Sequence, residues 1–105
     1  MKQKIFTIHD KKAEAHFPPF YMPNLSMAIR TFGDMVNNAE SQISNHPEDY
    51  TLYELGEWED NDATFTIHKE KISHGNGIEF VPAGLMEEDN ATKAKTQNNL
   101  NILRN

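Results

Sequence analysis

The sequence predicts an α+β domain, a small antiparallel β-sheet in the order β-α-β-β-β with one amphipathic helix packed on one face. Two observations carry this prediction. Apolar residues recur at three- and four-residue spacing between positions 25 and 36, the pattern of a helix with one buried side. Elsewhere, short runs rich in β-branched and aromatic residues alternate with polar ones, the pattern of strands with one buried face.

Four strands are expected, at residues 4–9, 50–55, 63–68 and 78–81. In the first strand Phe6 and Ile8 lie on one side of the chain, because successive strand residues point to opposite faces. A turn at residues 46–49 precedes the second strand, and Pro47 presets its φ angle. An acidic loop at residues 59–62 then joins the second strand to the third as a hairpin.

The helix is expected at about residues 24–38, with Asn24 or Ser26 as its N-cap. Before it, residues 17–23 contain three prolines, and this composition predicts a rigid extended linker. Residues 83–105 are polar and carry one short apolar cluster. We therefore expect a single folded domain over residues 1–82 and a disordered tail beyond it.

Composition narrows the class of protein. A chain of 105 residues with 37% hydrophobic content is enough for one small core. The absence of cysteine excludes disulfides, thiolate nucleophiles and cysteine-based zinc sites. No apolar run reaches the roughly 20 residues that a membrane span needs, so we expect a soluble protein that is neither exported nor bound to a membrane.

The negative charge is concentrated in the expected domain. Residues 1–82 hold seven basic and thirteen acidic side chains, which accounts for the whole formal charge of −6. A domain of this sign is repelled by a polyphosphate at long range. Tight non-specific DNA binding is therefore disfavoured unless basic residues gather locally.

No motif in the sequence indicates an enzyme, a metal site or a cofactor. The histidines do not show the helical spacing of a zinc site, and we interpret them as surface or strand-end residues: His9, His16, His46, His68 and His74. The acidic loop lacks the ligand ladder of an EF-hand. No serine lies in a nucleophile elbow, and the glycines form no phosphate loop.

Aromatic residues on the strands allow a second interpretation, in which an open sheet face stacks single-stranded bases. The competing interpretation places these aromatics in the core and in a dimer contact, and the excess of acids favours it. A basic edge could form if the first strand lies close to the residues after His68. The candidate contacts for nucleic acid or a protein partner are Lys4, Lys11, Lys12, Arg30, Tyr53, Trp58, Phe65, Lys69 and Lys71, and Lys2 would extend the same edge.

One helix can cover only one face of the sheet. The other face would then expose large apolar residues, and a second copy of the chain is the commonest cover for such a face. We therefore expect a homodimer. The alternative is a monomer in which residues 17–22, or the apolar cluster at residues 100–103, fold over that face.

Several short runs together resemble the small nonstructural protein of gokushovirus-type microviruses, the tailless single-stranded DNA phages. The similarity covers residues 1 to about 82. It rests on Lys12-Ala13-Glu14-Ala15, Pro18-Pro19-Phe20 with Met22, Ala28-Ile29-Arg30, Phe32, Asp34, Val36-Asn37, His46-Pro47-Glu48-Asp49-Tyr50, Leu52, Leu55-Gly56 and Trp58.

The resemblance implies a non-enzymatic accessory protein for viral single-stranded DNA synthesis and genome packaging in the host cytoplasm. It implies that the protein acts through the replication complex, with the phage replication initiator or the host replication machinery as partner. It carries over no catalytic residue and no cofactor. The alternative function is a single-stranded DNA-binding module that uses the sheet aromatics.

Overall fold

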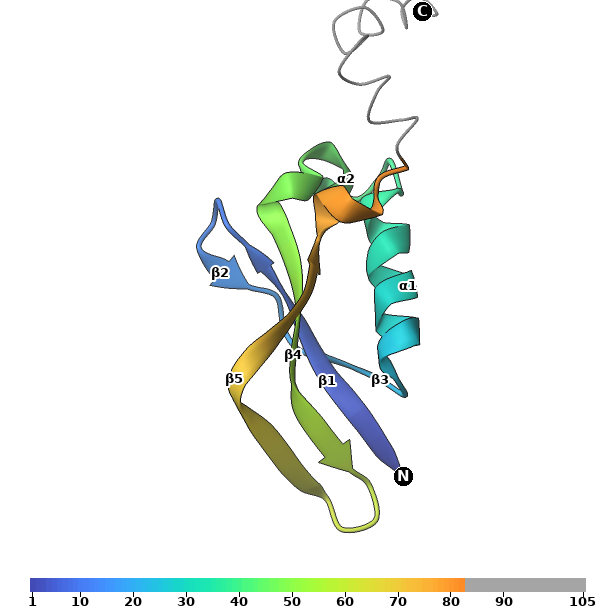
Figure 1. The fold of residues 1–105 in the computed structure, drawn as a ribbon, viewed down its shortest axis with the longest axis vertical. Coiled ribbons are helices and arrows are strands. Elements are labelled where there is room, and N and C mark those ends of the chain that lie inside the picture. The colour runs from blue at the N-terminus through green and yellow to red at the C-terminus, as the bar shows by residue number, and fades with distance from the viewer. Residues whose placement is uncertain (83–105) are drawn as a thin grey trace, which may run out of the picture.

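The structure is a computed structural model that describes residues 1–82. The expected disordered tail at residues 83–105 lies outside the described residues. The described chain is an antiparallel five-stranded sheet with one main helix lying along one side of it, which confirms the predicted α+β class (Figure 1).

The elements follow the chain in a simple order. The strands are β1 (Lys2–Asp10), β2 (Ala15–His16), β3 (Phe20–Met22), β4 (Tyr50–Glu59) and β5 (Thr64–Asn76). The helices are α1 (Leu25–Val36), the short α2 (Gln42–Asn45), and the 3-10 helices η1 (Pro47–Asp49) and η2 (Gly77–Phe80). The sheet runs β2-β1-β4-β5, and β3 also pairs with β1, so β5 is an edge strand.

Strand register decides which side chains share a face, because residues directly opposite each other on antiparallel strands point the same way. Ile8 lies opposite Leu52, and Phe6 lies opposite Glu54. These residues face α1. The odd-numbered residues of β1 point to the other side of the sheet, which no helix of residues 1–82 covers (Figure 1).

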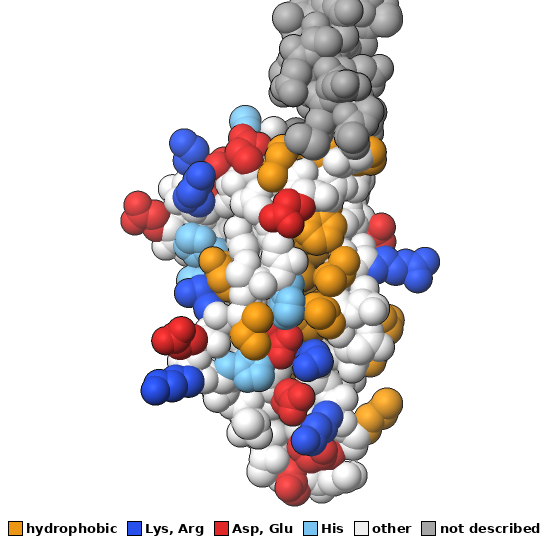
Figure 2. Space-filling view, viewed as in Figure 1, with side chains coloured by type: hydrophobic (Ala, Val, Ile, Leu, Met, Phe, Trp, Pro, Cys, Tyr) orange, Lys and Arg blue, Asp and Glu red, His pale blue; other side chains and the backbone are white. Residues whose placement is uncertain are grey.

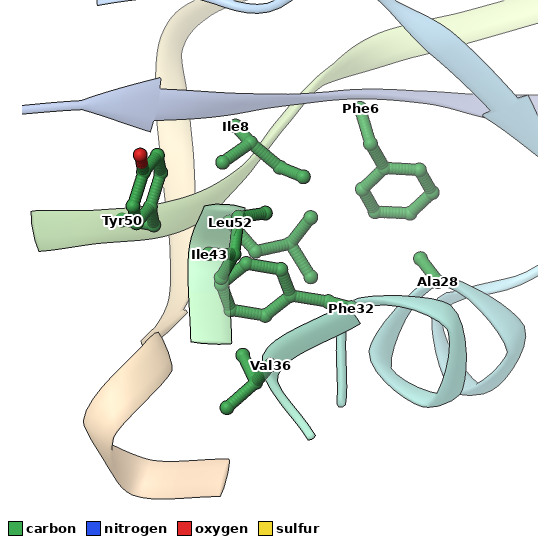
Figure 3. Packing of buried hydrophobic residues seen from close by; sticks show 8 residues of the cluster. All are labelled: Phe6, Ile8, Ala28, Phe32, Val36, Ile43, Tyr50 and Leu52. Atoms are coloured by element: carbon green, nitrogen blue, oxygen red, sulfur yellow. The ribbon is translucent and has the colours of Figure 1, made fainter. Parts of the chain in front are cut away.

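The hydrophobic core lies between α1 and the sheet. Figure 3 shows Phe6, Ile8 and Leu52 of the strands directed toward Ala28 and Phe32 of α1. All five side chains are fully buried. The helix begins where the sequence predicts, with Asn24 as its N-cap. The Asn24 side chain accepts a hydrogen bond from the backbone N–H of Met27.

The prediction of a last strand at residues 78–81 is wrong, because this segment forms the 3-10 helix η2. A capping box starts the helix, in which Asn76 and Glu79 each bond the other's backbone. Gly77 passes so close to Pro47 that a Cβ would lie 2.4 Å from the Pro47 carbonyl oxygen. The ring of Phe80 then packs on Phe32 at a centroid distance of 5.1 Å.

The prediction of an extended linker at residues 17–23 is also wrong in part. Three of its residues form β3 on the edge of β1, with Tyr21 opposite Ile5. Phe17, Phe20 and Met22 pack against the core. The prolines flank β3 and do not interrupt it, and the Phe17 carbonyl accepts a hydrogen bond from the buried hydroxyl of Thr7.

The third expected strand, at residues 63–68, continues to Asn76 as the long strand β5. Its pairing with β4 is irregular. Gly56 lies opposite Ile67 and Glu54 lies opposite Ile72, so one residue of β4 faces four residues of β5. This bulge shortens the span of β5 and brings residues on either side of it close together.

Removing a core side chain should destabilise the domain strongly. We expect Phe32→Ala to lower the free energy of unfolding by about 3–5 kcal/mol, because it removes a fully buried ring and leaves a cavity. Chemical denaturation followed by circular dichroism measures this. Met27→Ala is the matched control, since Met27 lies on the same helix with 46% exposure and should change stability by less than about 0.5 kcal/mol.

Candidate functional site

The sheet surface opposite α1, here called the helix-free face, carries several aromatic side chains and no helix of residues 1–82. Register places Gln3, Ile5, Thr7 and His9 of β1 on it. Their strand neighbours on this face are His16, Tyr21, Thr51, Tyr53, Gly56, Trp58, Phe65, Ile67 and Ser73. Phe65 and Ile67 are more than half exposed, at 57% and 62%.

The two faces of the sheet differ in charge. Register directs the carboxylates of β1 and β4 to the side of α1: Asp10, Glu54, Glu57 and Glu59. Lys71 reaches the helix-free face, since its ammonium lies over the Tyr53 ring. The helix-free face therefore combines aromatic and cationic side chains without the carboxylates of β1 and β4.

One end of the helix-free face is an open aromatic cleft near the β4–β5 loop. It has a volume of about 330 Å³ and is lined by Gln3, Tyr21, Trp58 and Phe65. The rings of Trp58 and Phe65 lie side by side, with centroids 4.8 Å apart and a tilt of 48°. Four different strands contribute one lining residue each, so the cleft exists only in the assembled sheet.

The other end of the helix-free face gathers histidines around Tyr53. The rings of His9 and His16 lie 4.5 Å apart, and both lie within about 6.5 Å of the Tyr53 ring. The ammonium of Lys71 sits over the same ring at 4.9 Å, a cation–π contact. Desolvation, together with the charges of His9 and Lys71, lowers the pKa of His16.

On the side of α1, Glu54 holds the middle of the sheet together. Its two carboxylate oxygens lie 2.7 Å from His68 Nε2 and 2.9 Å from His74 Nε2. The ammonium of Lys4 lies 3.4 Å from the same carboxylate. Both histidines come from β5, six residues apart, and would be about 20 Å apart on a regular strand. The bulge in β5 lets both reach one carboxylate.

Glu54 is almost fully buried, with 5% exposure. Burial alone raises the pKa of this carboxyl, because it disfavours the charged form. The hydrogen bonds from His68 and His74, with the charge of Lys4, outweigh burial and lower the pKa of Glu54. The carboxylate is therefore ionised in the folded protein and satisfied by three partners.

The structure divides the predicted contact residues between two faces. Tyr53, Trp58, Phe65 and Lys71 lie on the helix-free face, and Lys69 is exposed in the bulge of β5. The basic edge expected from residues 2 to 71 does not form as one surface, because Lys2 and Lys4 point to the side of α1 and pair there with Glu54 and Glu57. Arg30 is exposed on α1.

Lys11 and Lys12 lie in the β1–β2 turn, which is held by the Asp10 carboxylate through the backbone N–H groups of Lys12 and Ala13. Figure 2 shows Lys and Arg side chains projecting along its left-hand side, from the β1–β2 turn down to β5, with acidic side chains between them. This turn adjoins the histidine end of the helix-free face, since His9 pairs with His16 across it.

Sequence reasoning missed the roles of Gln3, Tyr21, Glu54, His68 and His74. No local pattern in the sequence indicated the bulge that brings two histidines onto the Glu54 carboxylate. Tyr21 was missed because residues 17–23 were interpreted as a linker and not as an edge strand.

A second cluster of titratable groups lies in the turn before β4. His46, Glu48 and Asp49 place one nitrogen and two carboxylate oxygens within 4.8 Å of one another. His46 and Glu48 are exposed, and their closest atoms are 3.8 Å apart. These three residues form a local cluster of two acids and one histidine at η1, and the described residues give no further sign of a metal there.

The sequence matches the family described as Phage ORF5 protein over residues 3–80. No curated protein and no solved structure matches the chain. The match confirms the phage origin that the resemblance implies, while the gokushovirus type stays a prediction. Within residues 1–82, no helix has the length and apolar character needed to cross a membrane.

Lowering the pH should destabilise the fold, because it protonates the Glu54 carboxylate. Because the pKa of Glu54 is lowered on folding, its contribution to stability is complete above its unfolded pKa of about 4.5 and is lost as the pH falls through the folded value. We expect Glu54→Gln to lower the free energy of unfolding at pH 7 by about 1–3 kcal/mol and to flatten its decline below pH 4.5. Urea denaturation from pH 7 to pH 3 measures both effects.

The control for this measurement is Glu40→Gln, which changes an exposed carboxyl in the loop between α1 and α2. It should leave both the stability and its pH dependence close to those of the unmodified protein. Equal pH profiles for Glu54→Gln and the unmodified protein would show that Glu54 does not control acid stability.

Proposed function

The chain belongs to the Phage ORF5 protein family, and on that premise we propose that it is a non-enzymatic accessory protein of a microvirus-type phage. Its proposed role is viral single-stranded DNA synthesis and genome packaging in the host cytoplasm. We further propose that it contacts single-stranded DNA directly, through the helix-free face. The proposal needs no cofactor, since stacking and charge are sufficient for binding of this kind.

The segregation of charge between the two faces of the sheet carries this proposal. Proteins that bind single strands combine a basic track for the phosphates with aromatic rings on which bases stack. The helix-free face offers Trp58 and Phe65 at one end and Lys71 and Tyr53 toward the other, with Lys69 exposed nearby in the bulge of β5. The carboxylates of β1 and β4 point to the opposite side, where Lys2 and Lys4 pair with two of them, Glu54 and Glu57.

The net charge of −6 does not decide whether the helix-free face binds DNA, because charges are screened over about 8–10 Å at physiological ionic strength. A phosphate bound at the helix-free face would therefore respond mainly to nearby lysines and histidines. Distant acids would slow the encounter and keep the affinity moderate. This predicts binding that is weak for a nucleic-acid-binding protein and steeply dependent on salt.

A second candidate function is favoured by the same net charge. In it, the protein touches no DNA and acts by binding the phage replication initiator or the host replication machinery. The exposed outer side of α1, with Arg30 and the 46% exposed Met27, would be available for such a partner. The expected homodimer through the helix-free face belongs with this candidate, because a second copy would occupy the surface that DNA needs.

Fluorescence anisotropy separates the two candidates. The full chain is titrated against labelled single-stranded oligothymidine at 50 and 200 mM salt, and sedimentation equilibrium gives its mass without DNA. Direct contact predicts saturable binding that weakens at the higher salt. Absence of binding, together with capture of the purified initiator or a dimeric mass, would replace DNA contact with the protein-partner function.

Removing the two lysines of β5 should weaken DNA binding. We expect Lys69→Gln combined with Lys71→Gln to lower the slope of log affinity against log salt by roughly 1.4, since each phosphate contact on a single strand contributes roughly 0.7. The same titration at four salt concentrations measures the slope. Arg30→Gln removes an exposed cation from α1 instead and should leave the slope unchanged. An unchanged slope in the double variant would exclude these lysines as phosphate contacts.

A further inference from the structure

We propose that the aromatic cleft at the β4–β5 end of the helix-free face holds one unpaired nucleobase of the bound strand. This inference rests on the proposed DNA contact and makes it specific. The cleft would select single strands over duplex, because a base can enter it only when it is not paired. The lining residues are Gln3, Tyr21, Trp58 and Phe65.

The geometry of the cleft suits a flat ring. Trp58 and Phe65 are direct partners in the register of β4 and β5, and their rings pack together as one wall. Tyr21 rises from β3, on the far side of β1, and is 42% exposed. Strands two positions apart in a sheet are separated by about 10 Å, which leaves room for a planar group between the walls.

The size and lining of the cleft limit what can fill it. Its volume of about 330 Å³ is at the small end of the roughly 300–1,000 Å³ found for ligand sites, so it accepts one ring system and not a folded chain. Three of its four lining residues are aromatic. Base–aromatic stacking tolerates any base, because every base has a π-face.

Gln3 adds the polar group that a base requires. It lies on β1 directly opposite Trp58 and is half-buried beside the rings. A glutamine amide presents both donors and an acceptor, so it can hydrogen-bond the edge of any base without selecting strongly among them. An aliphatic ligand would leave this amide without a partner, at a desolvation cost.

Charge complementarity favours a nucleotide chain over a second copy of this protein. The cleft shares its face with Lys69, Lys71 and the two histidines near Tyr53. The carboxylates of β1 and β4 point away from this face, so on these strands a second copy packed face to face would offer its cations no partner. A single strand alternates planar bases with phosphates, and it matches a face that alternates rings with cations.

The charges also set the direction in which the strand leaves the cleft. Asp60 and Asp62 lie in the loop between β4 and β5, next to the cleft. Asp60 is paired with the N-terminal ammonium, so Asp62 is the main charge that repels phosphates there, whereas the exposed Lys69 and Lys71 further along β5 attract them. The strand therefore runs from the cleft toward Tyr53 and the β1–β2 turn, where Lys11 and Lys12 are exposed.

The single tryptophan of the chain reports directly on this cleft. The full chain is titrated with three probes of equal length: single-stranded oligothymidine, the same backbone with abasic sites at every position, and a blunt duplex. We expect the oligothymidine to quench Trp58 fluorescence and to bind on the order of 10-fold more tightly than the abasic strand, because only the first offers a base to stack. The duplex should bind no better than the abasic strand.

Phe65→Ala and Tyr21→Ala should each reduce oligothymidine affinity on the order of 10-fold and leave abasic affinity unchanged. Phe65→Tyr keeps a ring and should retain the affinity, which guards against loss by misfolding. Ile72→Ala is the matched control, since Ile72 is also an exposed apolar residue of β5 but pairs with Glu54 and so lies on the side of α1, away from the cleft.

Each outcome has a distinct meaning. Salt-dependent binding with equal affinity for the abasic strand and for Phe65→Ala would overturn the base cleft but leave DNA contact in place. No binding of either single strand would overturn both proposals. A dimer that buries Trp58 and excludes oligothymidine would assign the cleft to a second copy and likewise overturn them.

Discussion

The carboxylate of Glu54 is the constraint on which the arrangement of the sheet depends. It is buried beside the core and must remain hydrogen-bonded, because an unpaired charge in this position would cost several kcal/mol. Its partners are Lys4 of β1 and two histidines of β5. Three strands are thus tied together at one point, since β4 supplies the carboxylate and both of its neighbours supply the donors.

That constraint explains the irregular course of β5. His68 and His74 can reach one carboxylate only if the strand between them bulges away from β4, and four residues of β5 stand there against one of β4. The bulge contains Lys69 and Lys71, and the ammonium of Lys71 reaches the Tyr53 ring on the helix-free face.

The difference in side chains between the two faces of the sheet follows from the same register. The side toward α1 carries the core and the carboxylates of β1 and β4, of which Glu54 and Glu57 are paired with histidines or lysines. The helix-free face carries the aromatic rings that lie outside the core, and β3 adds Tyr21 at the margin of this face. A small acidic domain can in this way present a surface that suits a polyanion, which its total charge does not suggest.

The sequence by itself determined the fold class and the position of α1. These follow from local periodicity: apolar residues at helical spacing in residues 25–36, and β-branched and aromatic residues that alternate with polar ones in the strands. The resemblance to a phage protein also came from short runs of residues, and the family match over residues 3–80 agrees with it.

Only the tertiary structure decided the candidate site, for three physical reasons. The cleft takes one residue from each of four strands, and no local pattern joins them. The pairing of His68 and His74 depends on a bulge that Glu54 imposes from another strand. The segment at residues 78–81 has the composition of a strand, but the capping box at Asn76 and the packing of Phe80 on Phe32 turn it into a helix, because long-range contacts outweigh local preference.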